Sequence, residues 1–334
     1  MTTQAVGPAP KETETATESS APPTTAGRRK HKPSSAARGP QKPEILWVNV
    51  FLMGLIHLLG IAGIVYLATS FSWWTLGFAL LWGTCCGLSI TGGYHRLFSH
   101  STYKASGPLK LFYLLFGAAS VQDSALVWSA DHRRHHAFTD KDRDPYSVER
   151  GFFWAHMGWV MCKPLEPKGA QFVQDLKKDK LVTWQDRYYW PLAVVMGFIL
   201  PAAIATSWGD PIGGFLVAGC LRLLMQWHAT FSVNSFAHLI GGRPYAHNSS
   251  ARDSVIVAFM TFGEGYHNFH HRFQHDYRNG VRWWQFDPTK WWIWSASRVG
   301  LAGNLKRVSA ERLQAARETA REAMRAQRQP LRSN

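Results

Sequence analysis

The most informative feature of the sequence is where charge is missing. No Asp, Glu, Lys or Arg occurs between Glu44 and Arg96, and Asp210 is the one such residue between Arg187 and Arg222. A soluble domain does not contain uncharged stretches of this length, whereas about 20 apolar residues are enough for a helix to cross a bilayer. The sequence therefore argues against a purely soluble protein.

Cysteine patterns and a secretory leader are also missing. The four cysteines, Cys85, Cys86, Cys162 and Cys220, form no CxxC pair, and two of them lie inside apolar runs. Neither a disulfide framework nor a zinc ribbon fits, and a reducing, cytosolic environment is the natural expectation. The first 43 residues contain no apolar core of the kind that a signal peptide needs.

Charge of both signs is scarce overall, and the balance is strongly basic. The 37 Lys and Arg outnumber the 22 Asp and Glu, for a formal charge of +15. Such a balance indicates nucleic acid, an anionic membrane face or an anionic substrate. Because long uncharged stretches are present, an anionic membrane face or an anionic substrate is favoured, and no nucleic-acid partner is expected.

Four apolar stretches predict an all-α integral membrane protein. Neither of the short connections, 69–72 and 208–211, contains Lys or Arg, whereas the segments before, between and after the two pairs of stretches are rich in both. The positive-inside rule then places both termini and the long connection in the cytoplasm. The predicted spans cover about 46–68, 73–94, 189–207 and 212–233.

The remaining segments predict a tail at each end and a helical cap on the cytoplasmic side. Residues 1–43 are predicted to be a disordered basic tail, with Arg28, Arg29, Lys30 and Lys32 either touching anionic lipid or only setting topology. The four-span domain covers 44–304, its cap is formed by 95–188 and 234–304, and the apolar stretch 108–122 is too short to span. Residues 305–334 are expected to be a basic, largely solvated helix and tail.

The fifteen histidines are grouped, and the groups are typical of metal ligands. HRLFSH contains His95 and His100, and two HxxHH motifs follow, HRRHH and HNFHH. On a helix, positions i, i+3 and i+4 share one face, so each HxxHH presents up to three imidazoles to one place. HxxxxH does not align on a straight helix, since five residues turn about 500°, so we expect it where the second span ends and the chain bends. The two HxxHH motifs contain His132, His135, His136, His267, His270 and His271.

A weaker fourth element, NSFAH, places Asn234 and His238 at the end of the last span. Nine histidines and one asparagine exceed what one metal ion accepts, whereas two ions with four or five protein ligands each fit well. Imidazole suits Fe, Cu, Zn and Ni alike, so the ligand type leaves the element open. Asp131, Asp144 and Glu264 are candidates to orient imidazole N–H groups from behind.

The order of these motifs between two pairs of spans resembles the membrane fatty acyl desaturases, specifically the stearoyl-CoA (Δ9) branch. The resemblance covers about residues 45–305 and includes TGGYHRLFSHSTYKA, RGFFWAHMGW, NSFAHLIGGRPY and GEGYHNFHHRFQHDYRNG. Related acyl-lipid desaturases and alkane or sterol hydroxylases space their histidines differently.

The resemblance implies a di-iron centre, held by the nine histidines named above, with Asn234 acting through a water. It implies O₂-dependent removal of two hydrogens from an acyl chain, with two electrons from a donor, and redox-inert zinc cannot supply that chemistry. The acyl tail would enter an apolar tunnel bent at the metals, so that positioning selects the carbons that react.

Two departures from the family pattern bear on the partners. Ala130 stands where animal members carry an arginine that faces the CoA headgroup, so this departure leaves the acyl carrier open. The resemblance favours acyl-CoA, with acyl-carrier protein or a phospholipid ester as alternatives, and Lys163 and Trp128 are the candidate headgroup contacts. No HPGG haem motif and no iron–sulfur cysteine pattern occurs. We therefore expect a separate electron donor, either a ferredoxin or a cytochrome b5-type protein with its reductase, and a bacterial-type member in the inner membrane.

Three other classes of function are weighed against the desaturase. A membrane hydroxylase uses the same oxidant but leaves a hydroxyl on carbon, and the motif spacing favours desaturation. A His-rich metal transporter would place its ligands along a path through the bilayer. A structural membrane protein with incidental histidines does not account for two HxxHH motifs in one chain.

Overall fold

The computed structural model describes residues 43–163 and 169–328, and most of these residues are helical. The predicted basic tail, including Arg28 to Lys32, lies outside the described residues, as does the end of the chain from 329. The helices are α1 Trp47–Thr69, α2 Trp73–Leu88, α3 Gly107–Ala118, α4 Ala125–Phe138, α5 Phe152–His156, α6 Lys180–Arg187, α7 Tyr189–Val194, α8 Leu200–Ala205, α9 Pro211–Gly213, α10 Arg222–Asn234, α11 Phe236–Leu239, α12 Val255–Met260, α13 His267–Arg272, α14 Pro288–Arg298 and α15 Ala310–Arg328.

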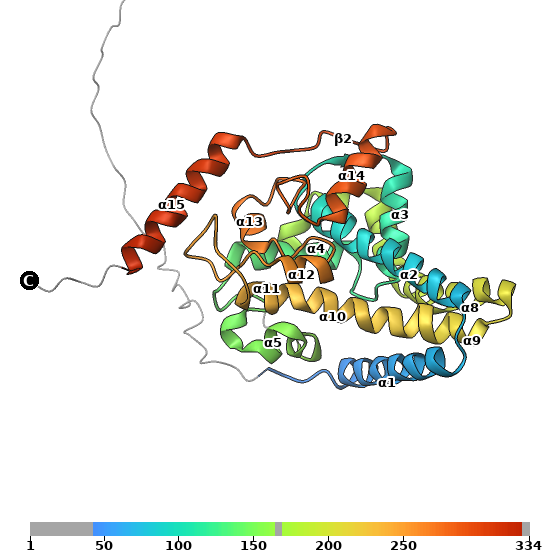
Figure 1. Ribbon diagram of the computed structural model, residues 1–334. Coiled ribbons are helices and arrows are strands. Elements are labelled where there is room, and N and C mark those ends of the chain that lie inside the picture. Colours follow the sequence, from blue (N-terminus) through green and yellow to red (C-terminus); the bar gives the residue numbers. More distant parts are fainter. Residues whose placement is uncertain (1–42, 164–168, 329–334) are drawn as a thin grey trace, which may run out of the picture. The chain divides into compact units, whose positions relative to one another are not determined.

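Three helical stretches of the described chain are long and apolar enough to cross a membrane. They are Trp47–Thr69, Trp73–Ser99 and Tyr189–Trp208, and Figure 1 shows α1, α2 and α8 on the same side as α10. Their outer faces carry exposed apolar side chains, among them Leu58 at 68% and Trp74 at 76% exposure. Such a face is stable in lipid, where apolar surface has no cost and every backbone group is satisfied within the helix.

The fourth predicted span is helical from Pro211 to Asn234 but is not among these three. Its second half contains Arg222, Gln226 and His228, which lower its apolarity. Arg222 is buried, 6% exposed, and donates hydrogen bonds to the carbonyl oxygens of Ala119, Gly197 and Ala218 at 2.9 to 3.1 Å.

The sequence predicts a bend at HRLFSH where the second span ends, and this prediction is wrong. The helix continues from α2 through Ser89–Ser99 as a π-helix, in which N–H groups bond the carbonyl five residues earlier, as His100 bonds the His95 carbonyl at 3.2 Å. A π-helical turn holds more residues than an α-helical turn. Residues five apart therefore return to one face, and His95 and His100 point the same way without a bend.

At the opposite end of the spans, Asp210 joins three helical segments. Its carboxylate accepts hydrogen bonds from the Tyr66 hydroxyl at 2.6 Å, from the Gly213 backbone N–H at 2.9 Å and from the Thr75 hydroxyl. Trp208 donates to Thr75 at 3.0 Å. The one charged residue between Arg187 and Arg222 is therefore a cap for α9 that also fixes α1 and α2.

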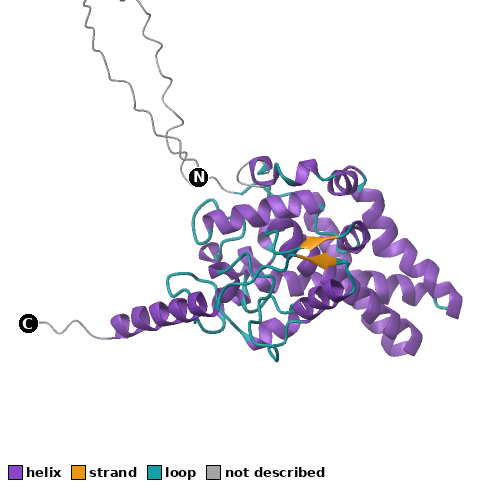
Figure 2. Cartoon of the chain, turned by 90° about the horizontal axis from the view of Figure 1, so that it is seen from above, coloured by secondary structure: helices purple, strands orange, loops and turns teal. Residues whose placement is uncertain are grey.

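Short elements close the side of the protein that carries the histidines. Strands β1 (Lys104–Ala105) and β2 (Ala302–Gly303) pair antiparallel between two helical regions, as Figure 2 shows. The predicted non-spanning stretch 108–122 contains α3. The C-terminal helix α15 is mostly exposed but buries Ala316 in a cluster with Phe269 and Tyr245, so it packs next to a histidine motif.

Candidate metal centre

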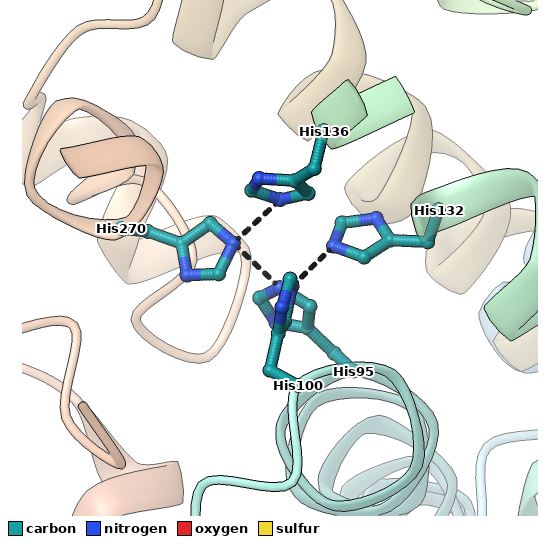
Figure 3. Close-up of side chains that lie close together, drawn as sticks. All are labelled: His95, His100, His132, His136 and His270. Atoms are coloured by element: carbon teal, nitrogen blue, oxygen red, sulfur yellow. Dashed lines mark hydrogen bonds between the residues drawn. The ribbon is translucent and has the colours of Figure 1, made fainter. Parts of the chain in front are cut away.

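Five histidines from three helical segments direct their rings at one place. One ring nitrogen from each lies within 4.8 Å of those of the other four, and the rings converge as Figure 3 shows. Nε2 of His270 is 3.0 Å from Nε2 of His95 and 2.9 Å from Nε2 of His136, and the Nε2 atoms of His100 and His132 are 2.8 Å apart. The five-histidine group is therefore His95, His100, His132, His136 and His270.

The other four predicted histidines form a second group. Nε2 of His267 lies 3.1 Å from Nε2 of His238 and 3.0 Å from that of His271, and Nε2 of His135 is 3.3 Å from that of His271. Their ligand atoms also lie within 4.8 Å of one another. Rings of the two groups touch, since those of His136 and His271 stack at 4.4 Å.

Each HxxHH motif divides its histidines between the two groups. In α4 the first and last, His132 and His136, belong to the five-histidine group, while His135 belongs to the four-histidine group. In α13 the pattern is reversed, because His267 and His271 join the second group and His270 joins the first. The i, i+4 pair of each helix thus serves one group, and the i+3 ring reaches across to the other.

Seven of the nine imidazoles are kept neutral. Burial, followed by the neighbouring histidines, holds the pKa of each of these seven below its ordinary value, and it lowers the pKa of His238 to about 3. A neutral imidazole has a lone pair on one nitrogen and can bind a metal ion. The rings with lowered pKa are His100, His132, His136, His238, His267, His270 and His271.

The inward-facing ring nitrogens fit metal ions, and few other partners could satisfy them. Where a ring's Nδ1 faces a carboxylate, its proton is on that side, and Nε2 presents a lone pair to the group. Two such lone pairs facing each other at about 3 Å repel unless a proton or a cation lies between them. A cation shared by four or five buried neutral rings removes that repulsion, and imidazole is a good ligand for Fe, Cu, Zn and Ni.

Glu264 holds the five-histidine group from behind through His95. Its Oε2 lies 2.7 Å from His95 Nδ1, and its Oε1 accepts from Arg96 at 3.0 Å. Burial opposes ionisation of Glu264, but His95 and Arg96 outweigh it and hold the pKa of the carboxyl below its ordinary value. Arg96 also pairs with Asp287 at 3.0 Å, so one buried cation bridges two carboxylates. Sequence reasoning found Glu264 but missed Arg96 and Asp287.

Two carboxylates stand behind the four-histidine group. Asp144 Oδ1 is 2.9 Å from His135 Nδ1, the position expected for it. The Nδ1 of His238 is 2.6 Å from the Ser250 hydroxyl, which in turn donates to Asp140. Nothing in the sequence indicates Ser250, because it lies twelve residues from His238 on a loop with no motif of its own.

The other predicted site residues line a cavity. Asp131 and the partly buried Asn234 both face it, and Trp128 stacks on His132 with 5.0 Å between ring centroids. Lys163 also lines it, and its Nζ is 2.5 Å from Glu44 at the exposed surface. The structure therefore places Trp128 against the five-histidine group and Lys163 at the start of α1.

The cavity has a volume of about 930 Å³ and runs between α1, α2 and α10. Most of its wall is apolar, and His95 and His132 reach it from the five-histidine group. Gly87, also in the wall, lies so close to Phe262 that a Cβ there would come within 2.7 Å of the ring. An apolar space that reaches a metal centre can hold an apolar chain in a fixed position beside it.

The sequence as a whole matches a known family. Residues 71–299, more than half of the chain, match the family Fatty acid desaturase. The chain is 45% identical over 261 residues to a probable acyl-CoA desaturase of Schizosaccharomyces pombe (78% of this chain, 54% of that protein) and 44% identical over 241 residues to acyl-CoA desaturase 1 of Saccharomyces cerevisiae (72% and 47%). It is 40% identical over 276 residues to stearoyl-CoA desaturase 2 of Mus musculus (81% and 77%).

This protein belongs to the fatty acid desaturase family. It spans about half the length of the two yeast relatives.

Replacing Glu264 by Gln is expected to weaken metal binding without preventing it. The amide cannot hold the Nδ1 proton of His95 as a carboxylate does, and loss of such a supporting partner typically costs about 10- to 100-fold in metal affinity. The dissociation constant for Fe²⁺, measured anaerobically against a competing chelator, checks this. Glu149→Gln, at an exposed carboxylate, is the matched control, and equal affinities in both variants would contradict the role of Glu264.

Acidification should destabilise the metal-free protein well before its carboxylates titrate. Below pH 6.5 the unfolded chain protonates its histidines, whereas the buried rings stay neutral. Each such ring removes up to about 1.4 kcal/mol of unfolding free energy per pH unit below its ordinary pKa. Asp253, whose pKa burial raises to about 7, acts in the opposite direction but is a single group. The thermal unfolding midpoint should be lower at pH 5.5 than at pH 7, and it should be nearly the same at pH 7 and pH 8. A midpoint that stays constant from pH 7 down to pH 5.5 would contradict the buried neutral rings.

Proposed function

We propose that this protein is an O₂-dependent fatty acyl desaturase that inserts a cis double bond at Δ9 of a saturated C16 or C18 acyl-CoA. The observation that carries the proposal is the placement of two adjoining groups of histidines, of which the five-histidine group reaches a mostly apolar cavity of about 930 Å³. That volume lies within the range of about 300–1,000 Å³ usual for ligand sites. The names of the yeast and mouse relatives support the acyl-CoA substrate.

The metals in this proposal are two irons, one in each histidine group. Iron with O₂ supplies an oxidant strong enough to remove hydrogen from an unactivated acyl carbon, which zinc in the same ligands cannot do. Asn234 is proposed to act through a water beside the four-histidine group, since its side chain faces the cavity and the next ligand, His238, follows one turn later.

The protein's own residues orient the histidine rings and hold the acyl chain beside them. Glu264 and Asp144 fix the rings of His95 and His135 through Nδ1, so that Nε2 of each faces its group. Trp128 stacks on His132, and both side chains form part of the cavity wall. Walls from α1, α2 and α10 hold the acyl chain at one depth, and positioning then decides which carbon pair lies next to the histidines.

The headgroup is proposed to lie near Lys163, where the cavity meets the exposed surface. Lys163 pairs with Glu44, and both side chains are more than half exposed, so the ion pair is weak and can open for an anionic group. Ala130, the position of the missing arginine, is buried in the core and leaves no room for a headgroup contact of its own.

The membrane arrangement is proposed to have four spans, with the histidines and both termini in the cytoplasm. The helical stretch 211–234 would be the fourth span, because the buried Arg222 exposes no charge to lipid. Electrons are proposed to come from a separate one-electron carrier, either a ferredoxin or a cytochrome b5-type protein, and the bacterial inner membrane stays a prediction.

The desaturase can be tested by product analysis in a host that cannot make monounsaturated fatty acids. Cells that express the parent chain should accumulate cis-9 C16 or C18 acids, whereas His135→Ala should make none because the four-histidine group loses a ligand. His247→Ala is the control, since His247 belongs to neither group. Immunoblots of the membrane fraction establish equal amounts of each protein.

The products also separate the alternatives. Hydroxy acids in place of double bonds would show a hydroxylase. No new lipid from an iron-loaded parent with a working electron donor would contradict the enzyme, and metal transport would then be the function to measure.

A further inference from the structure

Arg134 in α4 is a buried arginine with unpaired N–H groups. Its side chain is 2% exposed, and neither Nε nor Nη1 has a hydrogen-bond partner among the described residues. Arg222 is buried to a similar degree, but each of its guanidinium nitrogens donates to a backbone carbonyl oxygen. A buried donor without an acceptor has lost its hydration and gained nothing in return. Arg134 is therefore suited to a ligand that brings acceptor atoms.

Two indole N–H groups are in the same condition. Trp154 in α5 and Trp159 in the 3₁₀ turn Gly158–Met161 each bury Nε1, and neither nitrogen has a hydrogen-bond partner in the described part of the chain. An indole N–H can only donate. Arg134, Trp154 and Trp159 all line the cavity of about 930 Å³, and we call these three residues the donor cluster. A mostly apolar wall thus contains several donors that the protein itself does not satisfy.

Ring contacts place the donor cluster between the histidines and the exposed end of the cavity. Tyr146, also in the cavity wall, has its ring centroid 4.6 Å from that of His135 and 5.0 Å from that of Trp159. Four residues after Trp159, the chain reaches Lys163, whose side chain is 52% exposed. A ligand that extends from the histidines to Lys163 therefore passes the donor cluster.

The charges around the donor cluster favour an uncharged acceptor over a phosphate. Asp131, three residues before Arg134 on α4, lines the same cavity, so the charge there is not purely positive. Carbonyl oxygens are uncharged acceptors, and those around Arg222 show that they are sufficient for a buried guanidinium in this protein. In an acyl-CoA the thioester carbonyl and the amide carbonyls of the pantetheine arm follow the acyl chain, and the phosphates come only after them.

We propose that Arg134, Trp154 and Trp159 bind the carbonyl oxygens of the substrate's thioester and pantetheine arm. The inference rests on the proposed function, in which the acyl chain lies beside the histidines and the headgroup near Lys163. The arm then lies along the donor cluster, and its carbonyls supply the acceptors that the protein lacks there. A phospholipid ester has no such arm and would leave donors unpaired, so the cluster selects acyl thioesters of pantetheine.

Binding of two probes to the iron-loaded protein tests the assignment without turnover, if O₂ and reductant are left out. Palmitoyl-CoA has the arm and the phosphates, whereas palmitoyl-pantetheine has the arm alone. Arg134→Met should raise the Kd of both probes by the same factor, roughly 10- to 100-fold, which is the range for loss of hydrogen bonds to a charged group. Trp159→Phe removes only an N–H and should raise both Kd values roughly 2- to 10-fold.

Stability of the ligand-free protein separates binding from a structural role. Arg134→Met removes a buried guanidinium with unpaired nitrogens and replaces it by an apolar side chain of similar length, so its thermal unfolding midpoint should equal or exceed that of the parent. Arg134→Lys keeps the charge with fewer donors, and its Kd values should lie between those of the parent and Arg134→Met. Arg312→Met, at an exposed arginine of α15, is the matched control and should bind both probes as the parent does.

Three results would overturn the assignment. Unchanged Kd values in Arg134→Met would mean that the arm does not contact Arg134, and a loss for palmitoyl-CoA alone would mean that Arg134 contacts a phosphate. A lower unfolding midpoint of Arg134→Met would show that the arginine serves the fold.

Two further measurements keep this inference apart from the proposed function. Palmitoyl-acyl-carrier protein has the same arm as palmitoyl-CoA, and the parent's Kd for each identifies which carrier the cluster receives. A parent that binds these thioesters through Arg134 but forms no double bond would contradict the desaturase and leave the binding assignment in place. A parent that desaturates with no effect of Arg134→Met on either Kd would contradict the binding assignment alone.

Discussion

The structure depends on nine imidazoles that point a ring nitrogen inward at two places. Seven of these rings have a lowered pKa because burial and one another's presence oppose protonation. Bringing them together costs free energy unless cations compensate, since lone pairs at about 3 Å repel. The surrounding features answer that constraint: the π-helix directs His95 and His100 to one face, and Glu264 and Asp144 hold ring protons on the outer side.

The same constraint explains why charge is concentrated beside the histidines and nearly absent from the spans. Arg96 pairs with Glu264 and Asp287 within the protein, and Arg222 satisfies carbonyl oxygens around the π-helical stretches 195–199 and 214–221. Every guanidinium nitrogen of Arg96 and Arg222 has a hydrogen-bond partner, which a low-dielectric interior favours. The long uncharged runs then leave lipid-facing surfaces that need no further compensation.

Much of this organisation was predictable from the sequence, because it rests on local periodicity. Histidines at i, i+3 and i+4 predicted most members of the two groups that the structure brings together, and uncharged stretches predicted three helices long and apolar enough to cross a membrane. The division of each HxxHH motif between two groups was not predictable, since it depends on how α4 and α13 cross. The π-helix and the contacts of Arg96, Asp287 and Ser250 were missed because they join segments distant in sequence and follow no spacing rule.

Anomalous diffraction at the iron edge from crystals of the iron-loaded protein tests the central claim most directly. The account predicts two iron peaks, one surrounded by the five-histidine group and one by the four-histidine group, with Asn234 nearest the second. A single peak shared by both groups would contradict the assignment of two ions. A peak among His57, His156 and His228 would contradict the placement of the metal ions in the two groups.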